Sequence, residues 1–196
     1  MSLYEPLELH FHSPSEHTVA GKHHDLEMHI VHQYKGTNGQ LGAVIAIFFD
    51  REDGGNSYNA FIGSLDFENA VPYTEGDPEA EPEPIPEIFG TPLINANLAS
   101  FLSAVDMTRY WSYPGSLTTP PCTEGVKWTV IQEIQNIDDA QMEGFNKWFS
   151  DDPAFAEGNG NNRAVQELND RTVYTYEKHA VALASAALAV SAVALF

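Results

Sequence analysis

Three segments in the first fifty residues have the patterns of β-strands, and they restrict the fold more than any other feature. Residues 7–12 and 26–32 alternate, so that every second side chain shares a face. Residues 43–49 form a continuous apolar run, which is typical of a strand buried on both sides. One face of each alternating segment carries histidine and glutamate: Glu8, His10 and His12 in the first, and Glu27 and His29, with Val31, in the second. The sequence therefore predicts a sheet with imidazoles on one face.

Helical spacing is limited to two short segments, residues 93–105 and residues 138–149, the second with Asp138 and Asp139 near its start. Strands outnumber helices in the rest of the chain. A length of 196 residues with 43% apolar residues favours one domain with one sizeable core. We expect a mainly β fold with short surface helices.

The charge is strongly acidic, with 9 Lys and Arg against 28 Asp and Glu. A net charge of -19 repels phosphate backbones and excludes nucleic acid as a main partner. Acidic residues and prolines are concentrated in residues 74–88, and we predict an extended surface loop there because prolines cannot lie inside a sheet. A calcium or partner site is the alternative for this loop.

Residues 176–196 form an apolar tail, and the last seventeen of these residues carry no charge. A helix of that length extends about 25 Å, slightly less than the roughly 30 Å of a bilayer core. We predict a membrane anchor in this tail. A lipid-anchor signal and a helix packed on the protein are the alternatives.

Histidines are concentrated near the N-terminus, since seven of the eight lie within residues 10–32. Side chains two apart on a strand are about 6.6 Å apart at the base, so His10 and His12 can converge on one metal ion. His29 can supply a third ligand from a neighbouring strand. Three neutral imidazoles leave a zinc ion its double charge and one open position, as in catalytic sites, which predicts hydrolytic or hydration chemistry.

The other four histidines of this region have different expected roles. His23 and His24 lie in a connection beside Lys22, and we expect both to be exposed. His17 and His32 fall outside the ligand set, and we expect them to form structural hydrogen bonds.

Three motifs in a fixed order resemble the α-class carbonic anhydrases. Residues 15–31, from Ser-Glu-His-Thr-Val to Glu-Met-His-Ile-Val, resemble the signature of that family, and His-Phe-His precedes them at residues 10–12. Residues 110–121, Tyr-Trp-Ser-Tyr-Pro-Gly-Ser-Leu-Thr-Thr-Pro-Pro, resemble its second hallmark, with Glu124 and Trp128 at the expected offsets. Asn-Asn-Arg and Asn-Asp-Arg, at residues 161–163 and 169–171, resemble its closing segment. The resemblance implies a large twisted antiparallel sheet.

The resemblance also implies a role for individual residues. In this family pattern Zn²⁺ is held by His10, His12 and His29. Glu27 would hydrogen-bond His29, and Glu8 would hydrogen-bond His10. Thr118 accepts a hydrogen bond from the hydroxide on zinc and passes its own proton to Glu16. The family usually has a neutral amide at the position of Glu8, and a carboxylate there makes His10 more electron-rich and the bound water slightly less acidic.

The implied reaction is the reversible hydration of carbon dioxide to bicarbonate and a proton. Four residues match the apolar wall on which carbon dioxide rests: Val31, Val44, Leu117 and Trp128. Thr119 matches the polar edge of the same pocket. A non-catalytic module of the same fold and an inactive fragment are the main alternatives. A cupin-type metal dioxygenase is a remote one, because His-x-His followed by Glu also begins the cupin metal motif, in which Glu16 is a ligand.

The resemblance covers residues 5 to about 175 and implies that residues 1–175 are the C-terminal two-thirds of the catalytic domain, with the N-terminal strands missing. The proton-shuttling histidine of the family then has no counterpart in this chain. In secreted and membrane-bound members a cysteine at the position of Cys122 pairs with one near the N-terminus, and the resemblance places that partner in the missing segment. We therefore expect an extracellular, periplasmic or lumenal protein, attached to a membrane if the tail is an anchor.

Overall fold

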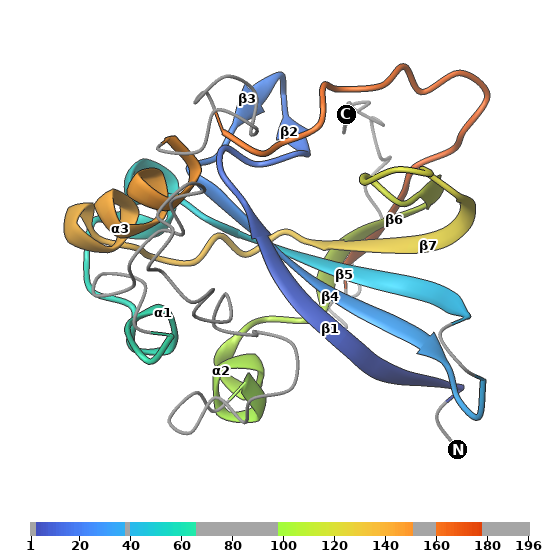
Figure 1. The fold of residues 1–196 in the computed structure, drawn as a ribbon, viewed down its shortest axis with the longest axis horizontal. Helices are drawn as coiled ribbons and strands as arrows, with labels where there is room; N and C mark the ends of the chain where they lie inside the picture. Colours follow the sequence, from blue (N-terminus) through green and yellow to red (C-terminus); the bar gives the residue numbers. More distant parts are fainter. Residues whose placement is uncertain (1–2, 38–39, 66–97, 151–159, 178–196) are drawn as a thin grey trace, which may run out of the picture.

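The computed structural model describes residues 3–37, 40–65, 98–150 and 160–177 (Figure 1). Its elements, in chain order, are β1 (Tyr4–His12), β2 (Thr18–Val19), β3 (Lys22–His23), β4 (Leu26–Tyr34), β5 (Leu41–Phe49), the π-helical turn η1 (Arg51–Gly55), α1 (Ala60–Gly63), α2 (Leu98–Ala104), β6 (Arg109–Ser116), β7 (Glu124–Ile131), α3 (Asp139–Ser150) and β8 (Tyr174–Glu177). The mainly β fold with short helices is confirmed.

Six strands form one sheet in the order β1-β4-β5-β7-β6-β8, and β2 and β3 form a small separate hairpin. The sheet is mixed, which corrects the antiparallel sheet expected from the sequence. β5 and β7 run parallel, with Val44 opposite Trp128, while the other neighbouring pairs are antiparallel. A parallel pair needs a long crossover, and here the chain passes through α2 and β6 between the two strands.

The two faces of the sheet bury separate apolar clusters. The helices α1, α2 and α3 lie on one side of the sheet (Figure 1). In the first cluster, Phe61 of α1, Phe101 of α2 and Phe145 of α3 pack with side chains of β1, β4 and β5. The second cluster lies on the opposite face and joins β4, β5, β6 and β7: Val31, Val44, Ala46, Phe48, Trp111, Val126, Trp128 and Val130. The alternation predicted for residues 7–12 and 26–32 therefore separates the apolar core from the histidine-bearing face.

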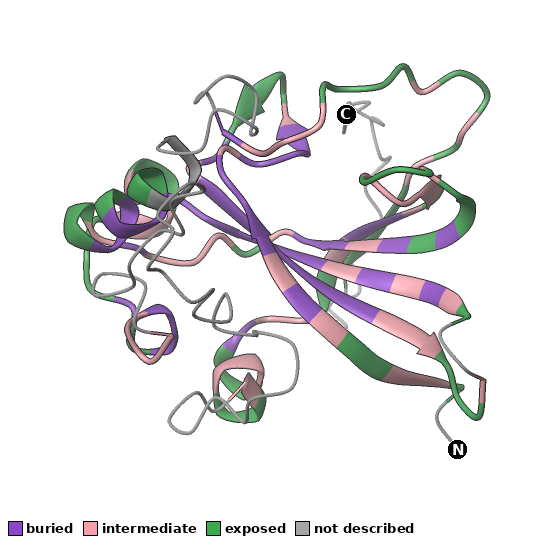
Figure 2. Ribbon diagram, viewed as in Figure 1, coloured by how far each residue is buried: buried purple, intermediate pink, exposed green. Residues whose placement is uncertain are grey.

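Figure 2 shows the same alternation along β7, where buried and exposed residues follow one another over Val126, Lys127 and Trp128. β5 is less fully buried than its apolar sequence suggested, because Ala43 and Ile45 are half-buried. Asp50 ends this strand and accepts hydrogen bonds at 2.8 Å from the backbone N–H groups of Glu52 and Asp53, which starts η1.

The predicted helices agree with α2 and α3 where the structure describes them. The start of the first predicted helix, the acidic loop of residues 74–88 and residues 178–196 of the tail lie outside the described residues. Tyr176, which we assigned to the tail, belongs to β8 and pairs with Tyr110 of β6. No helix within the described ranges is long and apolar enough to cross a membrane.

Candidate metal centre

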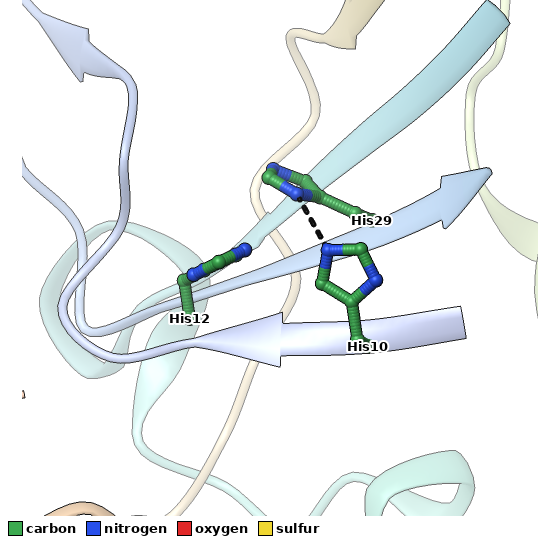
Figure 3. A group of neighbouring side chains, drawn as sticks. All are labelled: His10, His12 and His29. Atoms are coloured by element: carbon green, nitrogen blue, oxygen red, sulfur yellow. Dashed lines mark hydrogen bonds between the residues drawn. The ribbon is translucent and has the colours of Figure 1, made fainter. Parts of the chain in front are cut away.

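Three histidines converge on the face of the sheet that carries the second apolar cluster (Figure 3). His10 and His12 come from β1 and His29 from β4, and the antiparallel register places His10 directly opposite His29. The ring centroids are 4.6 to 5.1 Å apart. One nitrogen of each ring lies within 4.8 Å of the corresponding nitrogens of the other two. The structure thus brings together the three histidines that the sequence selected.

Two carboxylates determine which nitrogens of His29 and His10 face the cluster. Nε2 of His29 is 2.7 Å from Oε1 of Glu27, and Nδ1 of His10 is 3.0 Å from Oε1 of Glu8. A carboxylate only accepts hydrogen bonds, and a neutral imidazole has a single N–H, so the nitrogen facing each carboxylate carries the proton. The remaining nitrogens, Nδ1 of His29 and Nε2 of His10, have bare lone pairs and are 3.2 Å apart. Two lone pairs at this distance repel each other unless a cation lies between them.

The third histidine also presents a nitrogen without a proton. Nδ1 of His12 lies 3.2 Å from the backbone oxygen of Asn161 and donates to it. The side chain of Asn161 holds this arrangement, because it accepts from the N–H of Ser13 at 2.9 Å and donates to the oxygen of Phe11 at 3.0 Å. Nε2 of His12 is buried and has no hydrogen-bond partner among the described residues. A buried polar atom without a partner is costly, and a metal ion would remove that cost.

The His10 and His29 nitrogens fit zinc in distance, and His12 and His29 fit it in protonation. Nitrogen ligands about 2.0–2.1 Å from a tetrahedral zinc ion are about 3.3–3.4 Å from one another, close to the separation of the His10 and His29 nitrogens. Burial lowers the pKa of both His12 and His29 to about 4, although Glu27 opposes the shift at His29. Both rings are therefore neutral near pH 7, the form in which imidazole binds a metal.

Glu16 and Thr118 lie beside the histidines. The side chain of Glu16 is buried, and its Oε1 accepts a hydrogen bond of 2.7 Å from the backbone N–H of Arg163. Its Oε2 is buried, lies 4.0 Å from Nδ1 of His29 and has no hydrogen-bond partner among the described residues. Thr118 and Glu16 line one cavity of about 60 Å³, without a hydrogen bond between them in the described part of the chain.

A second cavity, of about 180 Å³, opens beside His10 and His29. Its wall contains every residue that the family resemblance assigned to the substrate pocket, namely Val31, Val44, Leu117, Thr119 and Trp128. Glu8, Thr118 and Leu41 also line it. Leu41 was not selected from the sequence, although it lies three residues before Val44 on β5. A larger cavity of about 910 Å³ contains Cys122 and Arg163 but none of the three histidines. Cys122, the single cysteine, is a half-buried free thiol.

His24 corrects one expectation from the sequence. It is buried, not exposed, and its ring packs 4.6 Å from Phe48. Its Nδ1 lies 3.3 Å from Asp50 and 3.6 Å from Asp53. Lys22 lies at the outer side of this group, with its Nζ 3.0 Å from Oδ2 of Asp53 and 2.7 Å from Oε2 of Glu52.

The remaining histidines lie as predicted. His23 is exposed, and Nδ1 of His32 is 2.9 Å from the backbone oxygen of Ile30. His17 is buried and hydrogen-bonded to both Glu27 and Tyr113. Tyr113 was not selected as a site residue, because only the folded sheet brings β6 next to the loop that carries His17.

Comparisons with known proteins agree with the motifs and the fold. The family model of the eukaryotic-type carbonic anhydrases matches residues 1–177. Alpha carbonic anhydrase 7 of Arabidopsis thaliana is 34% identical over 174 residues, which cover 88% of this chain and 54% of the relative. A carbonic anhydrase of Klebsiella pneumoniae is 36% identical over 166 residues, which cover 85% of this chain and 55% of the relative. The chain therefore spans about half the length of the curated relatives it matches.

Solved structures give the same result. The α-carbonic anhydrase of Thermovibrio ammonificans, in complex with the inhibitor sulfanilamide, superposes with a TM-score of 0.59 at 32% identity, over 84% of this chain and 60% of that chain. A halotolerant carbonic anhydrase of Dunaliella salina superposes with a TM-score of 0.63 at 29% identity, over 88% of this chain and 61% of that chain. On the family model, the relatives and the shared fold, this chain belongs to the eukaryotic-type carbonic anhydrase family.

Proposed function

We propose that this chain carries the zinc centre and the substrate pocket of a carbonic anhydrase, which hydrates carbon dioxide reversibly to bicarbonate and a proton. The observation that carries the proposal is the convergence of three imidazole nitrogens without protons beside a partly apolar cavity. Family membership supports it, as do the relatives from Klebsiella pneumoniae and Nostoc, both named carbonic anhydrases. Because the chain spans about half of those relatives, the activity of the whole protein is part of the proposal.

Nε2 of His10, Nε2 of His12 and Nδ1 of His29 would hold the zinc ion. Bound zinc supplies a Lewis acid that lowers the pKa of the water it coordinates, an effect for which carbonic anhydrases are the standard example. Neutral ligands preserve the full positive charge of the ion. Glu27 and Glu8 keep the ring protons of His29 and His10 on the side away from it, and so set both tautomers.

The cavity beside His10 and His29 would bind carbon dioxide. Val31, Val44 and Trp128 are almost fully buried and give it an apolar wall. Carbon dioxide carries no net charge and no net dipole, so it loses little hydration free energy when it moves from water to this apolar wall. Bicarbonate is charged and binds an apolar wall less well, which favours its release in the hydration direction.

Thr118 and Glu16 would orient the reacting groups. Oε1 of Glu16 already accepts from the backbone N–H of Arg163, which leaves Oε2 free to accept a proton donor. If the Thr118 hydroxyl donates its one proton to Oε2 of Glu16, the Thr118 oxygen can only accept a hydrogen bond from the pocket side. It then binds only a reacting group that carries a proton, and it turns the lone pairs of that group toward the carbon of the substrate.

The test is metal analysis coupled to a carbon dioxide hydration assay, with and without sulfanilamide. We expect one zinc per chain and sulfonamide-sensitive hydration in the wild-type protein, and loss of both in His12→Ala. His23→Ala is the matched control, since His23 is exposed and outside the cluster. Zinc without hydration would support a non-catalytic binding module, and absence of zinc would refute the proposed centre.

A further inference from the structure

The cavity beside His10 and His29 has a single carboxylate in its wall. Glu8 lines this cavity, and the other described residues around it include no lysine, no arginine and no further acidic side chain. Arg163 and Arg171 line the neighbouring cavity of about 60 Å³ and not this one. Within the described wall, no cation therefore balances the charge of Glu8.

The pairing of β1 with β4 fixes the position of this carboxylate. Glu8 lies directly opposite Val31, a residue of the apolar wall, and the side chains of directly opposed residues lie on one face of a sheet. The pairing is continuous from Glu8 to His12, so the carboxylate lies on the same face as the histidines of β1. The charge thus belongs to the surface that the proposed substrate would contact.

Glu8 uses one of its two carboxylate oxygens in the folded chain. Oε1 lies 3.0 Å from Nδ1 of His10, while Oε2 has no hydrogen-bond partner among the described residues. The hydrogen bond from His10 lowers the pKa of Glu8, so the carboxyl group is ionised at neutral pH. Its side chain is 31% exposed, so water screens the charge only in part. A negative charge therefore remains at the cavity wall.

The proposed substrate and product differ in charge, because carbon dioxide is uncharged and bicarbonate is an anion. Two like charges a few ångströms apart repel each other even at the effective dielectric constant of about 20 that applies near a protein surface. We propose that Glu8 is a specificity-determining residue, which weakens the binding of bicarbonate and other small anions in this cavity and leaves the binding of carbon dioxide almost unchanged. This inference rests on the proposed function, which makes the cavity the substrate pocket.

The consequence is weaker retention of product and weaker inhibition by anions. A catalyst cannot change the equilibrium between carbon dioxide and bicarbonate, so Glu8 does not favour one direction of the reaction. It lowers the fraction of the protein whose cavity is occupied by an anion at a given anion concentration. A protein with this carboxylate therefore keeps its pocket free at anion concentrations that would fill a neutral pocket.

The experiment measures the dissociation constant of thiocyanate for protein loaded with Co²⁺, which a site of imidazole ligands accepts in place of Zn²⁺. The visible absorption of the cobalt ion changes when an anion binds to it. Glu8→Gln and Glu8→Lys form a charge series. Glu5→Gln and Glu5→Lys are the matched controls, since Glu5 lies on the same strand and does not line the cavity.

We expect the thiocyanate dissociation constant to be about threefold to tenfold lower in Glu8→Gln and lower again in Glu8→Lys. Both Glu5 variants should stay within about twofold of the wild type, although they change the net charge equally. Metal content is measured in every variant, because Glu8 also accepts a hydrogen bond from His10. A variant that merely distorted the position of His10 would bind thiocyanate more weakly, in the opposite direction.

A second readout is inhibition of carbon dioxide hydration by bicarbonate, whose inhibition constant should fall by a similar factor in Glu8→Gln. Unchanged or weaker anion binding in Glu8→Gln, in a protein that hydrates carbon dioxide, would overturn the inference and leave the proposed function standing. Anion affinity that rises along the Glu8 series, in a protein that does not hydrate carbon dioxide, would support the inference and refute the proposed function. A wild-type protein that binds neither metal would overturn both.

Discussion

Nε2 of His10 and Nδ1 of His29 face each other at 3.2 Å, while each ring donates its one proton to a carboxylate on its other side. This pair explains why Glu8 and Glu27 belong to the site although neither touches the centre of the cluster. The two carboxylates differ in burial: Glu27 is completely buried and Glu8 is partly exposed. That difference makes them a natural pair for comparison.

We predict that Glu27→Gln weakens zinc binding about 10- to 100-fold. The amide places an NH₂ group where three N–H donors converge, two from His17 and one from His29, so at least one donor loses its acceptor. Glu8→Gln should weaken zinc binding about fivefold or less, because glutamine keeps an acceptor toward His10 and water screens the half-exposed position. Chelator competition on both variants checks the order, and equal losses would contradict it.

The metal-free protein should lose stability as the pH falls. His12 and His29 have a pKa of about 4 in the folded chain and an ordinary value of 6.5, so between these values the unfolded chain binds more protons. The contribution of these two histidines to the free energy of unfolding is complete above pH 6.5. It decreases toward pH 4, by up to about 1.4 kcal/mol per pH unit for each ring.

Denaturant unfolding from about pH 7 to about pH 5, with a chelator present, measures this slope. Carboxylates such as Asp25, whose pKa is lowered by its hydrogen bond to Arg51, act in the same direction at lower pH. His12→Gln should therefore flatten the slope below pH 6.5, and His23→Gln, at an exposed position outside the cluster, is the matched control. A slope that is identical in both variants would count against burial of His12 as the cause.

Filling the cavity should block the reaction and spare the metal. Val44→Phe adds a ring to a wall of a cavity of only about 180 Å³, so we expect kcat/KM to fall about 10- to 100-fold with zinc content unchanged. Leu7→Phe, at an exposed position of β1, is the control. Full activity in Val44→Phe would show that substrate does not use this cavity.

Gly115→Ala should destabilise the protein by about 1–3 kcal/mol through overpacking. The added methyl group would lie 2.7 Å from Cδ1 of Trp128 and 2.9 Å from Cε2 of Tyr113. Ser116→Ala, at the next residue, removes an atom and should lower the free energy of unfolding by less. Urea unfolding of both variants gives the comparison, and a neutral Gly115→Ala would mean that the aromatic pair can move apart freely.

The sequence predicts the part of the site that depends on local periodicity. Alternation alone places His10 and His12 on one face and His29 on the corresponding face of a second strand, and the structure has both strands paired in that sense. The motifs add Glu16, Thr118 and the apolar wall, because they resemble a family pattern.

Contacts between distant segments could not be predicted in this way. The parallel pairing of β5 with β7, the burial of His24 against Phe48 and the contact of Tyr113 with His17 depend on tertiary packing. His24 illustrates the reason. A histidine beside a lysine in a short connection is usually solvated, but here η1 folds back and brings Asp50 and Asp53 against the ring.

The contact of Asn161 with His12 joins residues 149 positions apart, and the same asparagine also fixes the backbone at Phe11 and Ser13. During synthesis the ribosome completes β1 and β4 long before Asn161 leaves the exit tunnel. A nascent chain at that stage has three histidines but no partner to set the tautomer of His12. The hydrogen bonds that His12 makes in the folded chain therefore form only at the end of translation or after release.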